Sequence, residues 1–152
     1  MRTVIRREVD VAVPAALLWD YVTDWTRQGE WIPGTRVEPV DAADGVGGRL
    51  RAWTGVGRVG FWDRMTITTW APRPDGGGRV EVLHTGSVVR GEGEFEVLPV
   101  GADSSRMVWA ELLVVPFGRV GAAAFRLAGP AVRRMVDRTL RDLKTRAEEL
   151  DG

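Results

Sequence analysis

The sequence predicts an α+β fold in which an antiparallel sheet of about seven strands curls around one long C-terminal helix, with two short helices after the first strand. Three observations support this prediction. The chain opens with an alternating strand that runs into a helix beginning near Pro14. Candidate strands separated by turn residues fill the middle of the chain. The C-terminal end repeats apolar residues at helical spacing. A sheet with helices at both ends of its sequence tends to curl and leave a cavity, and we expect the functional site in that cavity.

Residues 3–13 alternate between apolar and polar side chains, as a strand with one buried face does. Residues 14–23 follow as a short helix, because proline suits the first helical turn. A second short helix is expected near residues 24–30, ending before Pro33. The first helix has one apolar face, made by Leu17, Leu18, Tyr21 and Val22.

The middle of the chain reads as a series of hairpins. Turn residues such as Asp44-Gly45 and Gly76-Gly77-Gly78 separate the candidate strands. Consecutive hairpins imply an antiparallel meander. The candidate strands are residues 35–42, 48–55, 61–71, 79–86, 91–99 and 105–116.

The pattern becomes helical from Arg119 onward. Gly129-Pro130 should break or kink this helix, because proline lacks the amide donor and clashes with the preceding turn. Beyond Pro130, one apolar stripe recurs at three- and four-residue steps and needs the sheet as its partner. The chain contains no evident linker or repeat, so residues 1–152 are expected to form a single domain.

Composition excludes several classes of function. Lys plus Arg and Asp plus Glu each total 21, and this neutral balance argues against nucleic acid as a partner. Cysteine is absent and histidine occurs once, so neither a cysteine nor a multi-histidine metal site is possible, and we expect no metal and no cofactor. No apolar run approaches the ~20 residues of a membrane span. The first residues lack the apolar core of a signal peptide, so a cytoplasmic location is expected.

Several short motifs occur together with this order of elements. They are Pro14, Leu18-Trp19, Asp24-Trp25, Trp31, Pro33, the strand Phe95-Glu-Val97, Trp109-x-Glu111, Pro116-Phe-Gly118 and the long terminal helix. Over essentially the whole chain this combination resembles the helix-grip fold of the START-like (SRPBCC) superfamily, particularly its bacterial polyketide cyclase/dehydrase-type members. The resemblance implies a polyketide-like or lipid-like ligand. Members of the superfamily bind, cyclise or hydrolyse ligands or act as assembly factors, so the site chemistry must be argued separately.

Strand alternation identifies the side chains that face the concave side of the sheet. Three ionisable residues fall on that side: Asp63, His84 and Glu111. The strand at 105–113 also allows the opposite orientation, with Val108, Ala110 and Leu112 inward. The expected ligand-binding residues are Trp31, Met65, Ile67, Val82, Phe95, Trp109, Phe125 and Met135.

Hairpin register predicts that the ionisable residues meet. Folding the strands at 79–86, 91–99 and 105–113 onto one another sets His84 opposite Gly93, and Gly93 opposite Glu111. The imidazole and the carboxylate would then meet over a residue that has no side chain, with Asp63 on the next strand. A bulge or a two-residue register shift would instead send one of them to solvent.

The spacing of Gly55, Gly57 and Gly60 matches a dinucleotide-binding fingerprint. That motif must open a helix after a strand. Residues 61–67 read as another strand, so nucleotide binding is not expected, and we interpret the glycines as a hairpin loop at the cavity mouth.

The leading hypothesis is a binder of a hydrophobic small molecule, held between the sheet and the C-terminal helix as a monomer or homodimer. The first alternative is an aromatase/cyclase or dehydratase in which His84 is the general acid or base and Glu111 or Asp63 orients it. The second is a protein-interaction or assembly module that docks through an exposed patch of Trp62 and Trp70.

Overall fold

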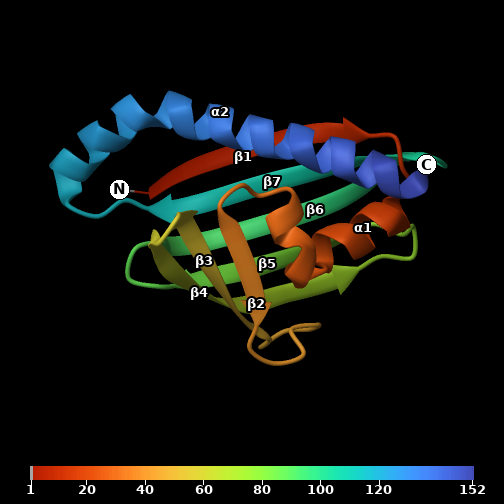
Figure 1. The fold of residues 1–152 in the computed structure, drawn as a ribbon, viewed down its shortest axis with the longest axis horizontal. Helices are drawn as coiled ribbons and strands as arrows, with labels where there is room; N and C mark the ends of the chain where they lie inside the picture. Colours follow the sequence, from red (N-terminus) through yellow and green to blue (C-terminus); the bar gives the residue numbers. More distant parts are fainter. Residues whose placement is uncertain (1) are drawn as a thin grey trace.

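The computed structural model describes residues 2–152. One antiparallel sheet holds all seven strands in the order β1-β7-β6-β5-β4-β3-β2, and it curves beneath a long C-terminal helix (Figure 1). The predicted helix-grip architecture is therefore confirmed. The elements are β1 (Arg2–Val11), α1 (Ala15–Thr23), the 3₁₀ helix η1 (Trp25–Glu30), β2 (Thr35–Pro39), β3 (Arg49–Val56), β4 (Val59–Pro72), β5 (Gly78–Thr85), β6 (Arg90–Gly101), β7 (Ser104–Val114) and α2 (Gly118–Asp151).

The core lies between the concave face of the sheet, α1 and the C-terminal half of α2. That half of α2 buries Val136, Leu140, Leu143 and Ala147. The N-terminal half packs much less, and Leu127 is 86% exposed there. Because only one half of the helix is pressed onto the sheet, space remains beneath the other half.

The helix α2 continues through Pro130, so of the two expected outcomes at Gly129-Pro130, a break or a kink, the break is wrong. Figure 1 shows a curved helix rather than two segments. Proline at this position removes the hydrogen bond to the carbonyl of Arg126. Both Arg126 and Pro130 are exposed, so water can satisfy that carbonyl and the helix bends without ending.

A β-bulge in β4 changes the direction of one tryptophan. The register between β4 and β5 shifts between Ile67 and Thr69, so residues after the bulge point to the opposite face from the one that simple alternation predicts. Trp70 consequently points inward, where its ring lies 5.6 Å from that of Trp19 and 6.4 Å from that of Trp25. The expectation that Trp70 is exposed is wrong.

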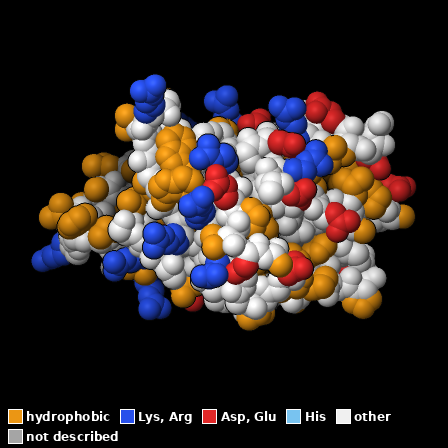
Figure 2. All heavy atoms as spheres, turned by 60° about the horizontal axis from the view of Figure 1, so that its bottom comes forward, with side chains coloured by type: hydrophobic (Ala, Val, Ile, Leu, Met, Phe, Trp, Pro, Cys, Tyr) orange, Lys and Arg blue, Asp and Glu red, His pale blue; other side chains and the backbone are white. Residues whose placement is uncertain are grey.

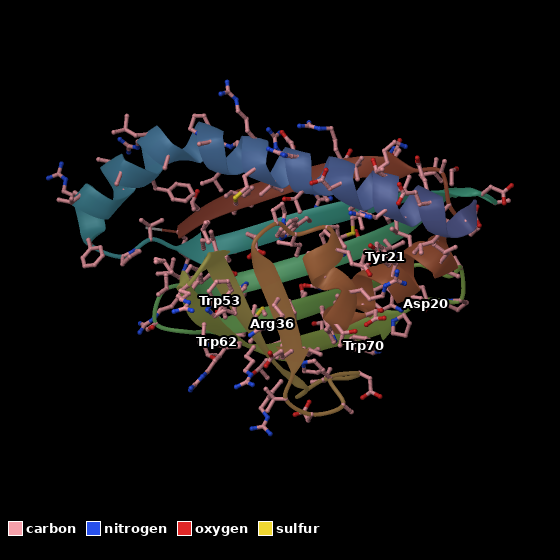
Figure 3. The ribbon with its side chains drawn as sticks, in the orientation of Figure 1. Asp20, Tyr21, Arg36, Trp53, Trp62 and Trp70 are labelled. Atoms are coloured by element: carbon pink, nitrogen blue, oxygen red, sulfur yellow. The ribbon has the colours of Figure 1, made fainter. Side chains whose placement is uncertain are left out.

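Trp62 precedes the bulge and points outward, with 40% of its surface exposed. The guanidinium of Arg51 lies 4.8 Å from the centre of the Trp62 ring and that of Arg36 lies 5.8 Å away. Figure 3 labels Trp62 and Trp70 on this strand. The docking patch of Trp62 and Trp70 does not exist, because the two rings lie on opposite faces of the sheet.

The glycine-rich segment at Gly55–Gly60 forms the hairpin between β3 and β4, in which Gly57 adopts a positive φ of 60°. A strand follows it, so the helix that a dinucleotide-binding motif requires is not there. Among residues 2–152, no helix combines the length and the apolar character needed to cross a bilayer.

Candidate functional site

A cavity of about 280 Å³ lies between the concave face of the sheet and α2. Its lining is mainly apolar and comes from β1 to β7, the η1 region and α2. The lining residues Thr54, Phe61, Val89 and Leu113 lie at the end of the sheet where the β3–β4 and β5–β6 turns approach the start of α2. Figure 2 shows apolar side chains on the surface at this left-hand end, with basic side chains between them.

Five of the eight expected ligand-binding residues line the cavity: Met65, Val82, Phe95, Trp109 and Met135. Three do not. Trp31 is buried behind the wall, with its ring 5.6 Å from Phe95 and 6.1 Å from Trp109. Ile67 is 1% exposed within the core. Phe125, on the loosely packed half of α2, packs against the hydrophobic core.

Sequence reasoning missed the part of the wall formed by the first three strands. Leu50, Ala52 and Thr54 of β3 line the cavity, as do Ile5 of β1 and Val37 of β2. The residues of β3 alternate at the period of a strand, so the same inward-facing rule would have found them.

Asp63, His84 and Glu111 come together on the concave face. Nδ1 of His84 lies 2.7 Å from Oδ2 of Asp63, which is hydrogen-bond distance. Nε2 of the same imidazole lies 3.3 Å from Oε2 of Glu111. The side chains of His84 and Asp63 are each 9% exposed and that of Glu111 is 17% exposed. The three residues therefore form one buried polar cluster in an apolar wall.

The observed register differs from the predicted one at His84. Gly93 pairs with Glu111 as predicted, but His84 pairs with Gly91 rather than Gly93. This shift of two residues keeps His84 on the concave face, because side-chain direction repeats every two residues. The expectation that a two-residue shift would send one of the residues to solvent is therefore wrong. The imidazole then reaches Glu111 diagonally across β6.

Gly93 makes this approach possible. A Cβ atom at Gly93 would lie 3.0 Å from Nε2 of His84 and 3.2 Å from each carboxylate oxygen of Glu111. Trp109 holds the carboxylate from the other side, since its Nε1 donates a hydrogen bond of 2.7 Å to Oε1 of Glu111. The position of Glu111 is thus set by a missing side chain and an indole donor.

The surroundings of His84 favour its protonated form. Burial alone lowers the pKa of the imidazole, because a low-dielectric interior disfavours the charge. The hydrogen bond with Asp63 and the contact with Glu111 outweigh burial, and the pKa of His84 rises to about 9. The protonated imidazole therefore dominates at neutral pH, and Nε2 carries a proton that faces Glu111.

The cluster leaves several hydrogen-bonding atoms without a partner in the protein. Oδ1 of Asp63, Nε2 of His84 and Oε2 of Glu111 are buried and make no hydrogen bond of acceptable geometry. The two carboxylates contact opposite nitrogens of one ring, so each can orient one imidazole N–H group.

A protein-family model matches nearly the whole chain. The family model described as polyketide cyclase / dehydrase and lipid transport matches residues 2–148. None of the curated proteins matches the sequence significantly.

Solved structures resemble the chain in fold. The Zhui aromatase/cyclase from Streptomyces sp. R1128 is 18% identical with a TM-score of 0.78, over 100% of this chain and 97% of that one. A START superfamily protein from Mycobacterium smegmatis is 17% identical with a TM-score of 0.73, over 97% and 98%. A Thalictrum norcoclaurine synthase is 18% identical with a TM-score of 0.67, over 100% and 98%.

Proposed function

The chain belongs to the polyketide cyclase/dehydrase and lipid transport family, and from this premise we propose that its cavity binds a hydrophobic small molecule of polyketide-like or lipid-like type. The observation that carries the proposal is the cavity of about 280 Å³ between the sheet and α2. Ligand pockets are typically apolar clefts of roughly 300–1,000 Å³ with a few polar groups that orient the ligand. The lining of this cavity has that composition, and its volume lies just below that range.

Aromatic side chains favour a flat ligand. Phe95 and Trp109 line the cavity at right angles to one another, with ring centres 5.5 Å apart. Trp31 packs behind both rings and keeps them in place. Rigid aromatic walls contact a planar or greasy ligand over a large area without losing much side-chain entropy.

Native mass spectrometry of freshly purified protein tests this proposal. We expect a retained compound of a few hundred daltons, about the mass that a cavity of this size class accommodates. The same protein without a retained compound should bind an added naphthalene derivative, measured by titration calorimetry. A protein that retains no compound and binds no such probe would contradict the proposed function.

The contact between Asp63 and His84 favours a second candidate function, an aromatase/cyclase or dehydratase. A histidine held by a carboxylate on one nitrogen can transfer protons at the other. Here Nδ1 faces Asp63 at 2.7 Å, which leaves Nε2 on the side of Glu111 and Gly93. In this candidate function Asp63 and Glu111 position the imidazole, and His84 is the group that exchanges protons with the ligand.

A dehydration needs no acid or base other than His84, because this histidine both gives and takes back one proton. The imidazolium gives its Nε2 proton to a hydroxyl group of the ligand, and the C–O bond breaks as water leaves. The neutral imidazole then takes a proton from the carbon next to a carbonyl group, and the electrons of that C–H bond form the C=C bond. The histidine ends in the protonated form in which it began.

The variant His84→Gln tests catalysis separately from binding. With an aromatic β-hydroxyketone as substrate, turnover should fall by roughly 10²–10⁴-fold, the usual contribution of general acid–base catalysis. Affinity for a naphthalene probe should stay within about threefold, since the apolar walls are unchanged. Equal turnover by His84→Gln and the wild-type protein would contradict this second function.

A further inference from the structure

The ionisable residues that line the cavity are mostly acidic. Its ionisable lining residues are Asp63, His84, Glu94 and Glu111, and no lysine or arginine within residues 2–152 lines it. Glu94 is neutralised on the outer face, where its carboxylate lies 3.3 Å from the guanidinium of Arg79. The charges that a ligand meets are therefore those of the Asp63–His84–Glu111 cluster.

The arginines of β1 and α2 lie outside the lining of the cavity. Arg7 of β1 lies 3.1 Å from Asp137 of α2 in an ion pair. Arg126 and Arg133 of α2 are exposed and do not line the cavity. A ligand carboxylate in the cavity would thus meet no guanidinium among the lining residues.

The neutral polar residues of the wall already have partners. Gln28 donates a hydrogen bond of 3.3 Å to the carbonyl of Val22. The hydroxyl groups of Thr35 and Thr54 are 3.2 Å apart and hydrogen-bond to each other. Two buried carboxylate oxygens next to the cavity make no hydrogen bond of acceptable geometry: Oδ1 of Asp63, and Oε2 of Glu111, which lies 3.3 Å from Nε2 of His84.

Two carboxyl groups and one imidazole lie together in a buried, apolar wall, so the cluster holds more acidic than basic groups. Unpaired buried acceptors favour a donor, and a further negative charge at short range is repelled most strongly where water is excluded. On these grounds, which rest on the proposed function, we propose that the cavity accepts ligands whose buried polar end donates hydrogen bonds, and rejects ligands that carry a carboxylate or another negative charge at that end.

Three probes of nearly equal shape test the inference: naphthylethylamine, naphthylethanol and naphthylacetate. Their affinities are measured by titration calorimetry at neutral pH with the wild-type protein. We expect the acid to bind at least about tenfold more weakly than both the amine and the alcohol, because only the acid adds a negative charge beside the cluster. A smaller difference, or tighter binding of the acid, overturns the inference.

Variants of Asp63 and Glu111 test whether the preference against the acid arises from the Asp63–His84–Glu111 cluster. Asp63→Asn and Glu111→Gln each remove one negative charge, and each should reduce the ratio between alcohol and acid affinity by at least about threefold. The matched control is Glu92→Gln, because Glu92 is exposed on the outer face of the neighbouring strand β6. An unchanged ratio in both cluster variants, with thermal unfolding that shows they are folded, overturns the assignment.

The two proposals fail in different ways. If none of the three probes binds, the proposed function fails and the inference fails with it. If the probes bind and the acid binds as well as the alcohol, the cavity is a ligand site and only the charge selectivity is wrong.

Discussion

His84 and Gly93 lie on neighbouring strands, and the imidazole of His84 occupies space that any side chain at Gly93 would need. A Cβ atom at Gly93 would be 3.0 Å from Nε2 of His84, closer than most such contacts in proteins. The same atom would be 3.2 Å from the carboxylate of Glu111. The glycine is therefore required by the approach of a histidine to a carboxylate, and not by its own backbone conformation.

Gly93→Ala should lower the pKa of His84 from about 9 toward the ordinary value of 6.5. The added methyl group separates the imidazole from Glu111, so one of the two carboxylates that stabilise the protonated ring is lost. The chain contains a single histidine, so its imidazole signals in an NMR pH titration are unambiguous.

Gly45→Ala is the matched control, since a Cβ at Gly45 meets no atom within 4 Å. It should leave the His84 titration unchanged. An unchanged titration in Gly93→Ala as well would show that Glu111 does not contribute to the pKa.

The free energy of unfolding should fall as the pH rises from about 6.5 to about 9. His84 has a pKa of about 9 in the folded protein and about 6.5 when unfolded, so its contribution is complete below the lower value and is lost through the upper one. For this buried group the loss is at most about 3 kcal/mol.

Urea unfolding at several pH values measures this dependence. His84→Gln should remove most of it, because no other side chain has an ordinary pKa in this window when cysteine is absent. A wild-type stability that stays constant or increases across the window would contradict the raised pKa.

Val82 lines the cavity, so the larger ring in Val82→Phe would fill part of a small cavity. Binding of naphthylethanol should therefore weaken by about tenfold or more. Leu83→Phe is the control on the same strand. Leu83 points to the opposite face and is 40% exposed, so its replacement should leave affinity unchanged. Titration calorimetry of both variants measures the difference, and equal affinities would place the ligand outside this cavity.

Trp70→Ala should lower the free energy of unfolding by about 2–3 kcal/mol, because it removes the ring that packs against Trp19 and Trp25. Trp62→Ala, on the outer face of the same strand, should cost less than about 1 kcal/mol. Urea unfolding of the two variants makes the comparison. A larger loss in Trp62→Ala than in Trp70→Ala would contradict the inward direction of Trp70.

The elements of the fold were predictable because their signals are local. Alternation, turn residues and the helical stripe each depend on a few neighbouring positions, and the predicted strand bounds differ from the observed ones by at most three residues. The register of His84 was not predictable from the same signals. Thr85 pairs with Arg90, which centres the β5–β6 turn one residue earlier than expected and shifts the partner of His84 by two.

The bulge in β4 had no local signal. Thr68 and Thr69 read as ordinary strand residues, and nothing in their identity marks the extra residue that turns Trp70 inward. The positions of Trp31 and Phe125 relative to the cavity depend likewise on how η1 and α2 pack, which alternation within a strand does not describe.

The amino-acid order alone determined a curved antiparallel sheet around a terminal helix, and it indicated the concave face for Asp63 and His84. For Glu111 it left both faces of the strand open, although it favoured the concave one. The tertiary structure decided that these side chains are in contact. Contact across β6 depends on the register, on the curvature of the sheet and on the orientation of the His84 imidazole over Gly93. The tertiary structure also decided which apolar residues line the cavity, since only the C-terminal half of α2 packs closely against the sheet.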